Sequence, residues 1–205
     1  MLTAAHLFDQ YTSTSKVEAY RPGHLMEPVV RVRACLVAKS EREDLAIVQI
    51  DRPANFSTVS ACPALPVLHE EVEVARPSLD HGIFVGVVTT RASFIGVQGI
   101  PKYPSRSAVG RLSGRTRYAF EGLAELGMSG GGAYALDGQC VCGVVSLVDP
   151  RANDGAPITF VAAPSEFGKL MPSGTEMIGE RPSSVNRVHV TFQPSMWHPS
   201  ALLPR

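Results

Sequence analysis

Hydrophobic and polar residues alternate in several short segments of the chain. The clearest segment is 29–37, where valines and other apolar residues take turns with arginines. Because successive side chains of a β-strand point to opposite faces, this alternation predicts a strand with one buried face. Apolar runs bounded by Gly, Pro, Asp or Ser predict further strands at 16–20, 45–50, 72–76, 83–90, 109–113, 132–136, 140–147 and 158–162. The pattern therefore favours an all-β fold.

The connections between these segments add two local predictions. Asp137 and Gly138 stand between two apolar runs, and an Asp-Gly pair tolerates the positive φ angles of a type I′ turn. We therefore expect a hairpin that joins segment 132–136 to segment 140–147. Ser165 can cap one short helix over residues 164–171, shortly before Pro172.

A proline-rich connection at residues 51–66 divides the chain into an early and a late set of strands. Such a connection predicts a domain boundary near residue 60. We therefore expect residues 1–60 and 61–172 to form two units. Periodicity is lost after Pro172, which predicts a loosely held tail at 173–205.

Charge and composition exclude several classes of protein. The 205 residues include 19 basic and 19 acidic side chains, so no global charge directs the chain to nucleic acid or membranes. Hydrophobic residues make up 44% of the chain, which argues for a substantial core and against disorder. No apolar run reaches the roughly 18 residues that a membrane-spanning helix needs.

The start of the chain and its cysteines bear on the compartment. His6 and Asp9 interrupt the apolar stretch that a secretory signal needs, so we expect no targeting segment and, by default, a cytoplasmic location. The spacing of the cysteines does not fit a small domain held by disulfides, so we expect reduced thiols. The four cysteines are Cys35, Cys62, Cys140 and Cys142.

Three short motifs contain the side chains of a catalytic triad. They are Thr-Ala-Ala-His ending at His6, Asp-Leu-Ala beginning at Asp44, and Gly-Met-Ser-Gly-Gly around Ser129. An imidazole base, a carboxylate that fixes its tautomer and a hydroxyl nucleophile are the groups that acyl transfer needs. Small residues around Ser129 let the amides of Gly127 and Ser129 approach a developing oxyanion. Each motif is weak alone, but their order and context together are specific.

These motifs, with Gly-Val-Val-Ser ending at Ser146, resemble those of trypsin-like (chymotrypsin-fold) serine proteases. The resemblance covers roughly residues 1–171. It implies two antiparallel β-barrels with the triad His6, Asp44 and Ser129 in the cleft between them. In that family about three strands precede the catalytic histidine, so we expect the first barrel to be incomplete and the sequence to be N-terminally truncated.

The resemblance also bears on activation and specificity. Met128 occupies the place of an acidic residue that secreted members use after zymogen cleavage, so we expect no zymogen switch. Leu123 falls at the bottom of the primary pocket and Val148 at its wall, which implies a preference for small or medium apolar residues. Leu147 lies in the same pocket wall, after Ser146. Ser146 is expected either to donate a hydrogen bond to Asp44 or simply to pair within its strand.

Two further features have a functional and a structural interpretation. Residues 101–118 contain five basic and no acidic side chains, which could bind an acidic polymer, but we favour a solvated loop and strand beside the cleft and expect no nucleic-acid partner. Cys140 and Cys142 share a strand face, but no second pair completes a four-ligand metal site. We therefore expect small buried side chains here, with no metal and no cofactor.

The sequence as a whole predicts a serine endopeptidase acting on polypeptides through His6, Asp44 and Ser129. The alternative is a noncatalytic interaction module, in which loss of the first strands leaves the triad inactive. Nothing in the sequence indicates the oligomeric state.

Overall fold

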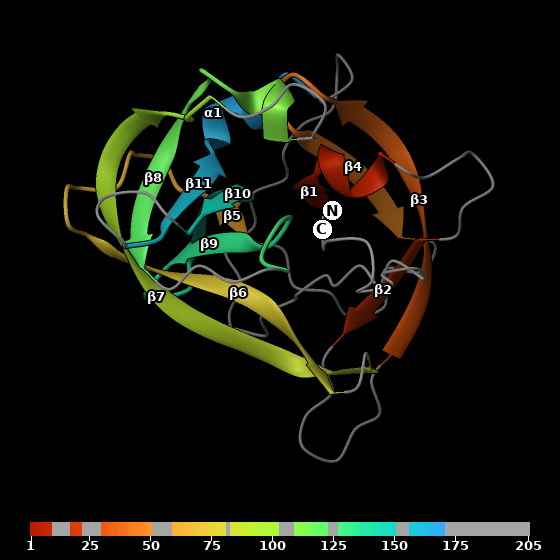
Figure 1. The fold of residues 1–205 in the computed structure, drawn as a ribbon. Coiled ribbons are helices and arrows are strands. Elements are labelled where there is room, and N and C mark those ends of the chain that lie inside the picture. Colours follow the sequence, from red (N-terminus) through yellow and green to blue (C-terminus); the bar gives the residue numbers. More distant parts are fainter. Residues whose placement is uncertain are drawn as a thin grey trace, which may run out of the picture.

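The computed structural model describes residues 1–9, 17–21, 30–50, 59–80, 83–102, 109–122, 127–150 and 156–170. Within these residues the strands form two units, a four-stranded sheet and a closed barrel. Figure 1 shows the sheet in red and orange and the barrel in yellow, green and blue. The predicted all-β class is confirmed, with one closed barrel, a second sheet and a single short helix among the described residues.

The N-terminal sheet is antiparallel throughout, in the order β1-β4-β3-β2. Its strands are β1 (Leu2–Ala4), β2 (Val17–Arg21), β3 (Val30–Ser40) and β4 (Leu45–Ile50). A short 3-10 helix, η1 (Ala5–Phe8), follows β1 directly. Apolar side chains from η1 and β4 pack into one small cluster, which consists of Ala5, Phe8, Ala46 and Val48.

The barrel has six strands and closes because β11 pairs with both β8 and β10. They are β6 (Glu71–Asp80), β7 (Ile83–Gly99), β8 (Thr116–Gly122), β9 (Gly132–Ala135), β10 (Cys140–Asp149) and β11 (Ile158–Ala162). The two-residue strand β5 (Ser60–Ala61) is added outside the closed ring, parallel to β10. Closure removes the exposed strand edges that would otherwise pair with other chains.

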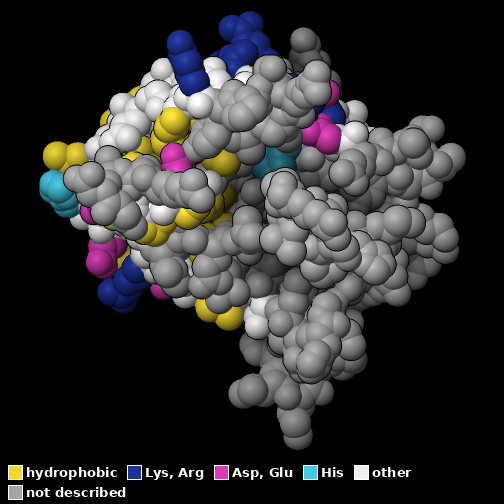
Figure 2. Space-filling model, in the orientation of Figure 1, with side chains coloured by type: hydrophobic (Ala, Val, Ile, Leu, Met, Phe, Trp, Pro, Cys, Tyr) yellow, Lys and Arg dark blue, Asp and Glu magenta, His cyan; other side chains and the backbone are white. Residues whose placement is uncertain are grey.

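Large apolar side chains fill the barrel. Phe94 and Phe120 lie with ring centroids 5.2 Å apart, and Met128 beside them is fully buried. A separate cluster joins the barrel to the N-terminal sheet, where Leu45 packs with Val144. Since burial of such side chains stabilises the folded state by about 25 cal/mol per Å², this cluster holds the two units together. Other hydrophobic side chains remain visible on the surface over the barrel (Figure 2).

The predicted C-terminal helix is present but short. α1 spans Pro164–Phe167 rather than reaching residue 171, and its N-cap is Ala163, not the predicted Ser165. Its buried Phe167 joins the cluster that contains Leu45 and Val144. The helix, which follows β11, therefore packs against both the N-terminal sheet and the barrel.

Several local predictions were wrong. Segment 109–113 was expected to be a strand, but it contains the 3-10 helix η2 (Val109–Leu112), held by turn bonds such as Ser113 N to Gly110 O at 3.3 Å. Strands β1, β5 and β8 were not predicted. In β8 the buried Arg117 interrupts the apolar pattern, so alternation alone did not reveal it.

The predicted hairpin between β9 and β10 is confirmed, but its turn type differs. Gly138 has φ +67, while Asp137 is not in the left-handed region. Gly138 N donates to Ala135 O at 2.7 Å, and Gln139 N donates to the Asp137 carboxylate at 2.9 Å. The side-chain bond of Asp137 and the freedom of Gly138 thus make a type I turn that is followed by a left-handed glycine.

The expectation of reduced thiols throughout was wrong, because Cys62 and Cys140 form a disulfide that ties β10 to the residue after β5. Cys35 and Cys142 are free. The proposed boundary between residues 60 and 61 falls within β5 and stays a prediction, while the predicted tail lies outside the described residues. No helix within the described ranges is long and apolar enough to cross a membrane.

Candidate active site

His6 and Asp44 lie side by side at one end of the N-terminal sheet. The Nδ1 atom of His6 is 3.0 Å from Asp44 Oδ1 and 2.9 Å from Oδ2. The backbone N–H of His6 also donates to Oδ1, at 2.9 Å. The Asp44 side chain is 4% exposed and that of His6 20%, so the carboxylate is enclosed while the imidazole reaches solvent.

Pairing of β1 with β4 places these two residues together. Ala4 pairs with Leu45, so the chain leaves β1 toward His6 at the point where Asp44 enters β4. Ala5 N donates to Asp44 O at 3.1 Å. Asp44 has φ +52, a left-handed conformation that Asp adopts more readily than most residues. Backbone and side chain of Asp44 thus hold η1 in one position.

A buried arginine supports the turn that carries Asp44. Arg117 of β8 donates from Nη2 to Glu43 O at 3.0 Å and from Nη1 to Glu166 Oε1 of α1, also at 3.0 Å. It therefore connects the barrel, the helix and the β3–β4 turn. Sequence reasoning placed Arg117 in a solvated basic stretch and missed this role. A basic residue within an apolar strand was the only signal that could have revealed it.

Contact with a carboxylate favours the tautomer of His6 in which Nδ1 carries the proton. An ionised carboxylate only accepts hydrogen bonds, so Nδ1 of His6 must donate to Asp44. Nε2 of the neutral ring is then an unprotonated acceptor, which is the arrangement of a general base. The pair can therefore accept a proton on Nε2 and stabilise the resulting imidazolium through Asp44.

Ser129 lies at the corner of a tight turn. Gly131 N donates to Met128 O at 2.9 Å, which puts Ser129 and Gly130 in the two central positions of a β-turn. Gly130 has φ +82 and Gly127 has φ +97, conformations that favour glycine. Gly130 N donates to Val145 O at 2.8 Å, so β10 fixes the turn. Ser129 is half-buried, next to the fully buried Met128.

The Ser129 turn touches the segment that carries His6. Thr3 Oγ1 donates to Gly130 O at 3.2 Å. A Cβ atom on Gly130 would lie 2.6 Å from Leu7 Cδ1 and would also overlap the Thr3 hydroxyl. The structure thus brings the Ser129 turn against β1 and η1. Among the described hydrogen bonds, those of the His6 ring go to Asp44, and none joins the ring to the Ser129 hydroxyl.

Of the four residues expected to contact substrate, the structure describes three. Leu123 lies outside the described residues. Ser146 is 2% exposed at a register shift in β10, and its hydroxyl has no hydrogen-bond partner among the described atoms. Leu147 is buried in an apolar cluster that includes Leu112 and Phe160. Val148 is partly buried and packs against the barrel core.

The basic stretch is partly used within the molecule. Arg111 forms an ion pair with Asp9, directly after η1, and Arg117 pairs with Glu166. Lys39 of β3 also pairs with Asp9, at 2.9 Å. Arg111 and Arg117 thus have partners within the molecule, and Arg117 is buried rather than solvated as expected.

No protein-family model matches the sequence, and no curated protein sequence matches it. Solved structures of proteases do match.

The crystal structure of the inactive form of Rv3671c protease matches with a TM-score of 0.57 and 18% identity, over 82% of this chain and 78% of that chain. The active form of Rv3671c protease from M. tuberculosis matches with 0.58 and 18% identity, over 87% and 71%. The apo MamO protease domain from Magnetospirillum magneticum matches with 0.56 and 12% identity, over 83% and 82%. The chain therefore has the fold of the trypsin-like, chymotrypsin-type serine proteases.

Proposed function

We propose that the chain is a serine endopeptidase in which Ser129 is the nucleophile, His6 the general base and Asp44 the carboxylate that orients His6. The observation that carries this proposal is the contact of His6 Nδ1 with both Asp44 carboxylate oxygens, at 3.0 and 2.9 Å, with the carboxylate only 4% exposed. A surface His–Asp pair would give little stability and no fixed ring orientation. Here the backbone bonds to Asp44 add that orientation.

In the proposed reaction, Ser129 Oγ attacks the carbonyl carbon of a bound peptide while Nε2 of His6 takes the hydroxyl proton. The tetrahedral oxyanion accepts hydrogen bonds from the amides of Gly127 and Ser129. His6 then gives its proton to the leaving amine, which leaves an acyl group on Ser129. Water, activated by His6 in the same way, releases the acid. This reaction needs no cofactor.

We further propose that the enzyme prefers small or medium apolar residues before the cleaved bond. Leu123 and Val148 supply no charge that could receive a basic side chain. Val148 is branched and partly buried, and it packs against the barrel core. A peptide library that gave a preference for Arg or Phe would contradict this specificity.

The proposal is tested by a fluorophosphonate probe, which reacts with activated serine hydroxyls. Intact-mass analysis of the labelled chain should show one added probe, with no addition to Ser129→Ala. His6→Ala should keep the hydroxyl but lose the labelling. Cleavage of a peptide library by the unmodified chain should disappear in the same two variants.

A noncatalytic interaction module is the second candidate function. It is favoured by one observation, which is that the described hydrogen bonds of the His6 ring do not include Ser129. If circular dichroism shows folded β structure but the probe adds nothing, the endopeptidase proposal fails and the interaction module is supported.

A further inference from the structure

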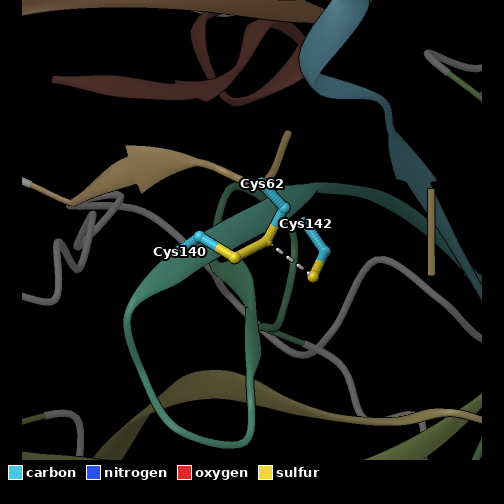
Figure 3. A group of neighbouring side chains, drawn as sticks. All are labelled: Cys62, Cys140 and Cys142. Atoms are coloured by element: carbon cyan, nitrogen blue, oxygen red, sulfur yellow. Dashed lines mark hydrogen bonds between the residues drawn. A yellow bond between two sulfur atoms is a disulfide. The ribbon is translucent and has the colours of Figure 1, made fainter. Parts of the chain in front are cut away.

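Three sulfur atoms meet where β5 ends beside the start of β10. Figure 3 shows the disulfide between Cys62 and Cys140 with the Cys142 side chain pointing toward it. The Sγ atom of Cys142 is 3.2 Å from that of Cys62. All three sulfurs lie within 4.8 Å of one another. A free thiol therefore touches a disulfide in the folded protein.

The backbone gives Cys62 access to both cysteines of β10. Cys62 N donates to Val141 O at 3.0 Å, and Val141 is the residue between Cys140 and Cys142. In the parallel pairing of β5 with β10, Ala61, the residue before Cys62, also pairs with Val141. Cys62 thus lies opposite the middle of the Cys140–Cys142 segment, and the fold allows either of these two cysteines to be its disulfide partner.

Chain entropy does not select between the two possible disulfides. The Cys62–Cys140 bond spans 78 residues, and a Cys62–Cys142 bond would span 80. Because loop-closure entropy depends on the logarithm of loop length, these two loops stabilise the folded state almost equally. The choice of partner therefore depends on local chemistry.

Metal binding is a less suitable use of this cluster. A disulfide sulfur is not a thiolate ligand, so the oxidised cluster offers only the Cys142 thiol. A soft metal ion held by protein thiolates normally needs three or four of them. The arrangement of one thiol against one disulfide fits exchange instead.

We propose that Cys62, Cys140 and Cys142 form a thiol–disulfide exchange site in which Cys62 is the shared sulfur. The Cys142 thiolate attacks Cys62 Sγ, a new Cys62–Cys142 bond forms, and the Cys62–Cys140 bond breaks. The bonding electrons leave with Cys140, which takes up the proton that Cys142 lost. One disulfide and one thiol are present before and after, so no external oxidant or reductant is needed.

Exchange changes which thiol can be reached from outside. Cys142 is 3% exposed and packs in the barrel core, while Cys140 is only half-buried. The step therefore converts a hidden thiol into one that a small thiol reagent or a dithiol reductant can reach. Since β10 also carries Ser146 to Val148, the exchange alters the anchoring of the strand proposed to contact substrate.

The surroundings of Cys142 make the exchange slow at neutral pH. Burial raises the pKa of its thiol to about 11, and the nearby carboxylates of Glu70 and Asp137 add to the rise. Tyr118 of β8 faces the same sulfur, and burial raises the pKa of its phenol too. Only the thiolate attacks, so the exchange rate should rise about tenfold per pH unit below the pKa of Cys142.

The test uses the full oxidised chain with Cys35→Ser, which removes the exposed fourth thiol. The protein is incubated with excess iodoacetamide at pH 7, 8 and 9, and labelled cysteines and disulfides are mapped by mass spectrometry without reduction. We expect the label on Cys140, together with a Cys62–Cys142 disulfide, and an approximately tenfold faster appearance per pH unit while exchange limits the rate. Adding Cys142→Ser should abolish the labelling, since Cys62–Cys140 then has no attacking thiol.

A second variant tests the geometry without kinetics. In a glutathione redox buffer, Cys140→Ser should form a Cys62–Cys142 disulfide as completely as Cys142→Ser forms Cys62–Cys140. Failure of the first variant to form its disulfide would overturn the proposal, as would failure of both. Label found only on Cys142, or no label on any cysteine, would overturn it as well.

Discussion

Gly130 is the residue whose size decides whether the two parts of the site fit together. Its φ of +82 is costly for other residues, and a Cβ atom there would overlap Thr3 and Leu7. Gly114 has a similar φ of +75 but open space around its Cβ position. Alanine substitutions at these two glycines therefore separate the free-energy cost of the left-handed backbone from the cost of a steric clash.

We predict that Gly130→Ala and Gly114→Ala each lower the free energy of unfolding by about 1–2 kcal/mol, from the left-handed conformation alone. Only Gly130→Ala should also displace β1 and η1, and with them His6. A displacement of about 1 Å costs on the order of 100-fold in rate, so probe labelling of Ser129 should slow by that factor. Equal labelling rates for the two variants would contradict this contact.

The residues of the site differ in how visible they are in the sequence. His6, Asp44 and Ser129 stand in short motifs whose residue types have a chemical reason and whose order matches that of the resembled family. Thr3, Glu43 and Arg117 act through contacts between distant segments, for example Arg117 with Glu43 O, 74 positions away. No local pattern encodes such a contact, so the supporting residues were found only in the structure.

At the scale of elements, Arg117 joins three of them. Its side chain is 3% exposed and that of Glu166 is 17% exposed. Arg117→Met keeps the apolar length but leaves a largely buried carboxylate and the Glu43 carbonyl without their donor. Breaking one side of such a buried pair costs about 3 kcal/mol or more.

We predict that Arg117→Met lowers the free energy of unfolding, measured in urea, by about 3 kcal/mol or more. Arg91→Met is the matched control, because Arg91 and Glu71 are 68% and 45% exposed and their pair should contribute less than about 1 kcal/mol. If the two variants lose the same stability, the role given to Arg117 is wrong.

The turn between β3 and β4 should make stability depend on pH through Glu43. Burial acts to raise the pKa of Glu43, but the Ser40 hydroxyl and the charges of Lys169, Arg42 and Arg115 outweigh it and lower the pKa below 4.5. A folded-state pKa below the unfolded value stabilises the protein above pH 4.5. That contribution is lost as the pH falls through the folded-state pKa.

We predict that Glu43→Gln reduces the loss of stability between about pH 5 and pH 3, measured by urea unfolding at each pH. Glu41→Gln is the control, because the Glu41 side chain is 57% exposed. Identical pH profiles for the two variants would show that Glu43 is not stabilised as described.

Elements with regular alternation were predictable, and irregular ones were not. The limits of β4 and β11 agree with the sequence because both segments are mostly apolar and Asp or Pro stands at or near each end. β5 has only two residues and depends on β10 for its bonds, and segment 109–113 has strand-like composition but is held in turns. Tertiary contacts decided these cases over local preference.

At the scale of the whole molecule, the order of motifs predicted the fold class, but not how the chain is closed. Pairing of β10 with β11 completes the barrel, and the Cys62–Cys140 disulfide ties β10 to β5. The spacing of the cysteines led to the prediction of reduced thiols. Four cysteines allow several pairings, and no local sequence pattern identifies one of them. Only the barrel geometry brings residues 62 and 140 to a Cα separation of 4.9 Å.

This closure leads to a prediction about global stability. In the chain-entropy model, a bond that closes a loop of 78 residues stabilises the folded state by about 4 kcal/mol. Cys62→Ser removes the shared sulfur, so the oxidised variant should lose about that amount in urea unfolding. The exposed Cys35→Ser should lose nothing measurable.

Cys140→Ser distinguishes a fixed disulfide from an exchangeable one. If Cys142 takes over as the partner of Cys62, its loop of 80 residues restores almost the same entropy, and the oxidised variant should keep most of the stability that Cys62→Ser loses. Addition of a dithiol reductant should then bring both variants to the same free energy of unfolding. Equal losses for Cys140→Ser and Cys62→Ser before reduction would mean that the barrel is closed by one specific bond, since Cys142, although in contact, would not replace it.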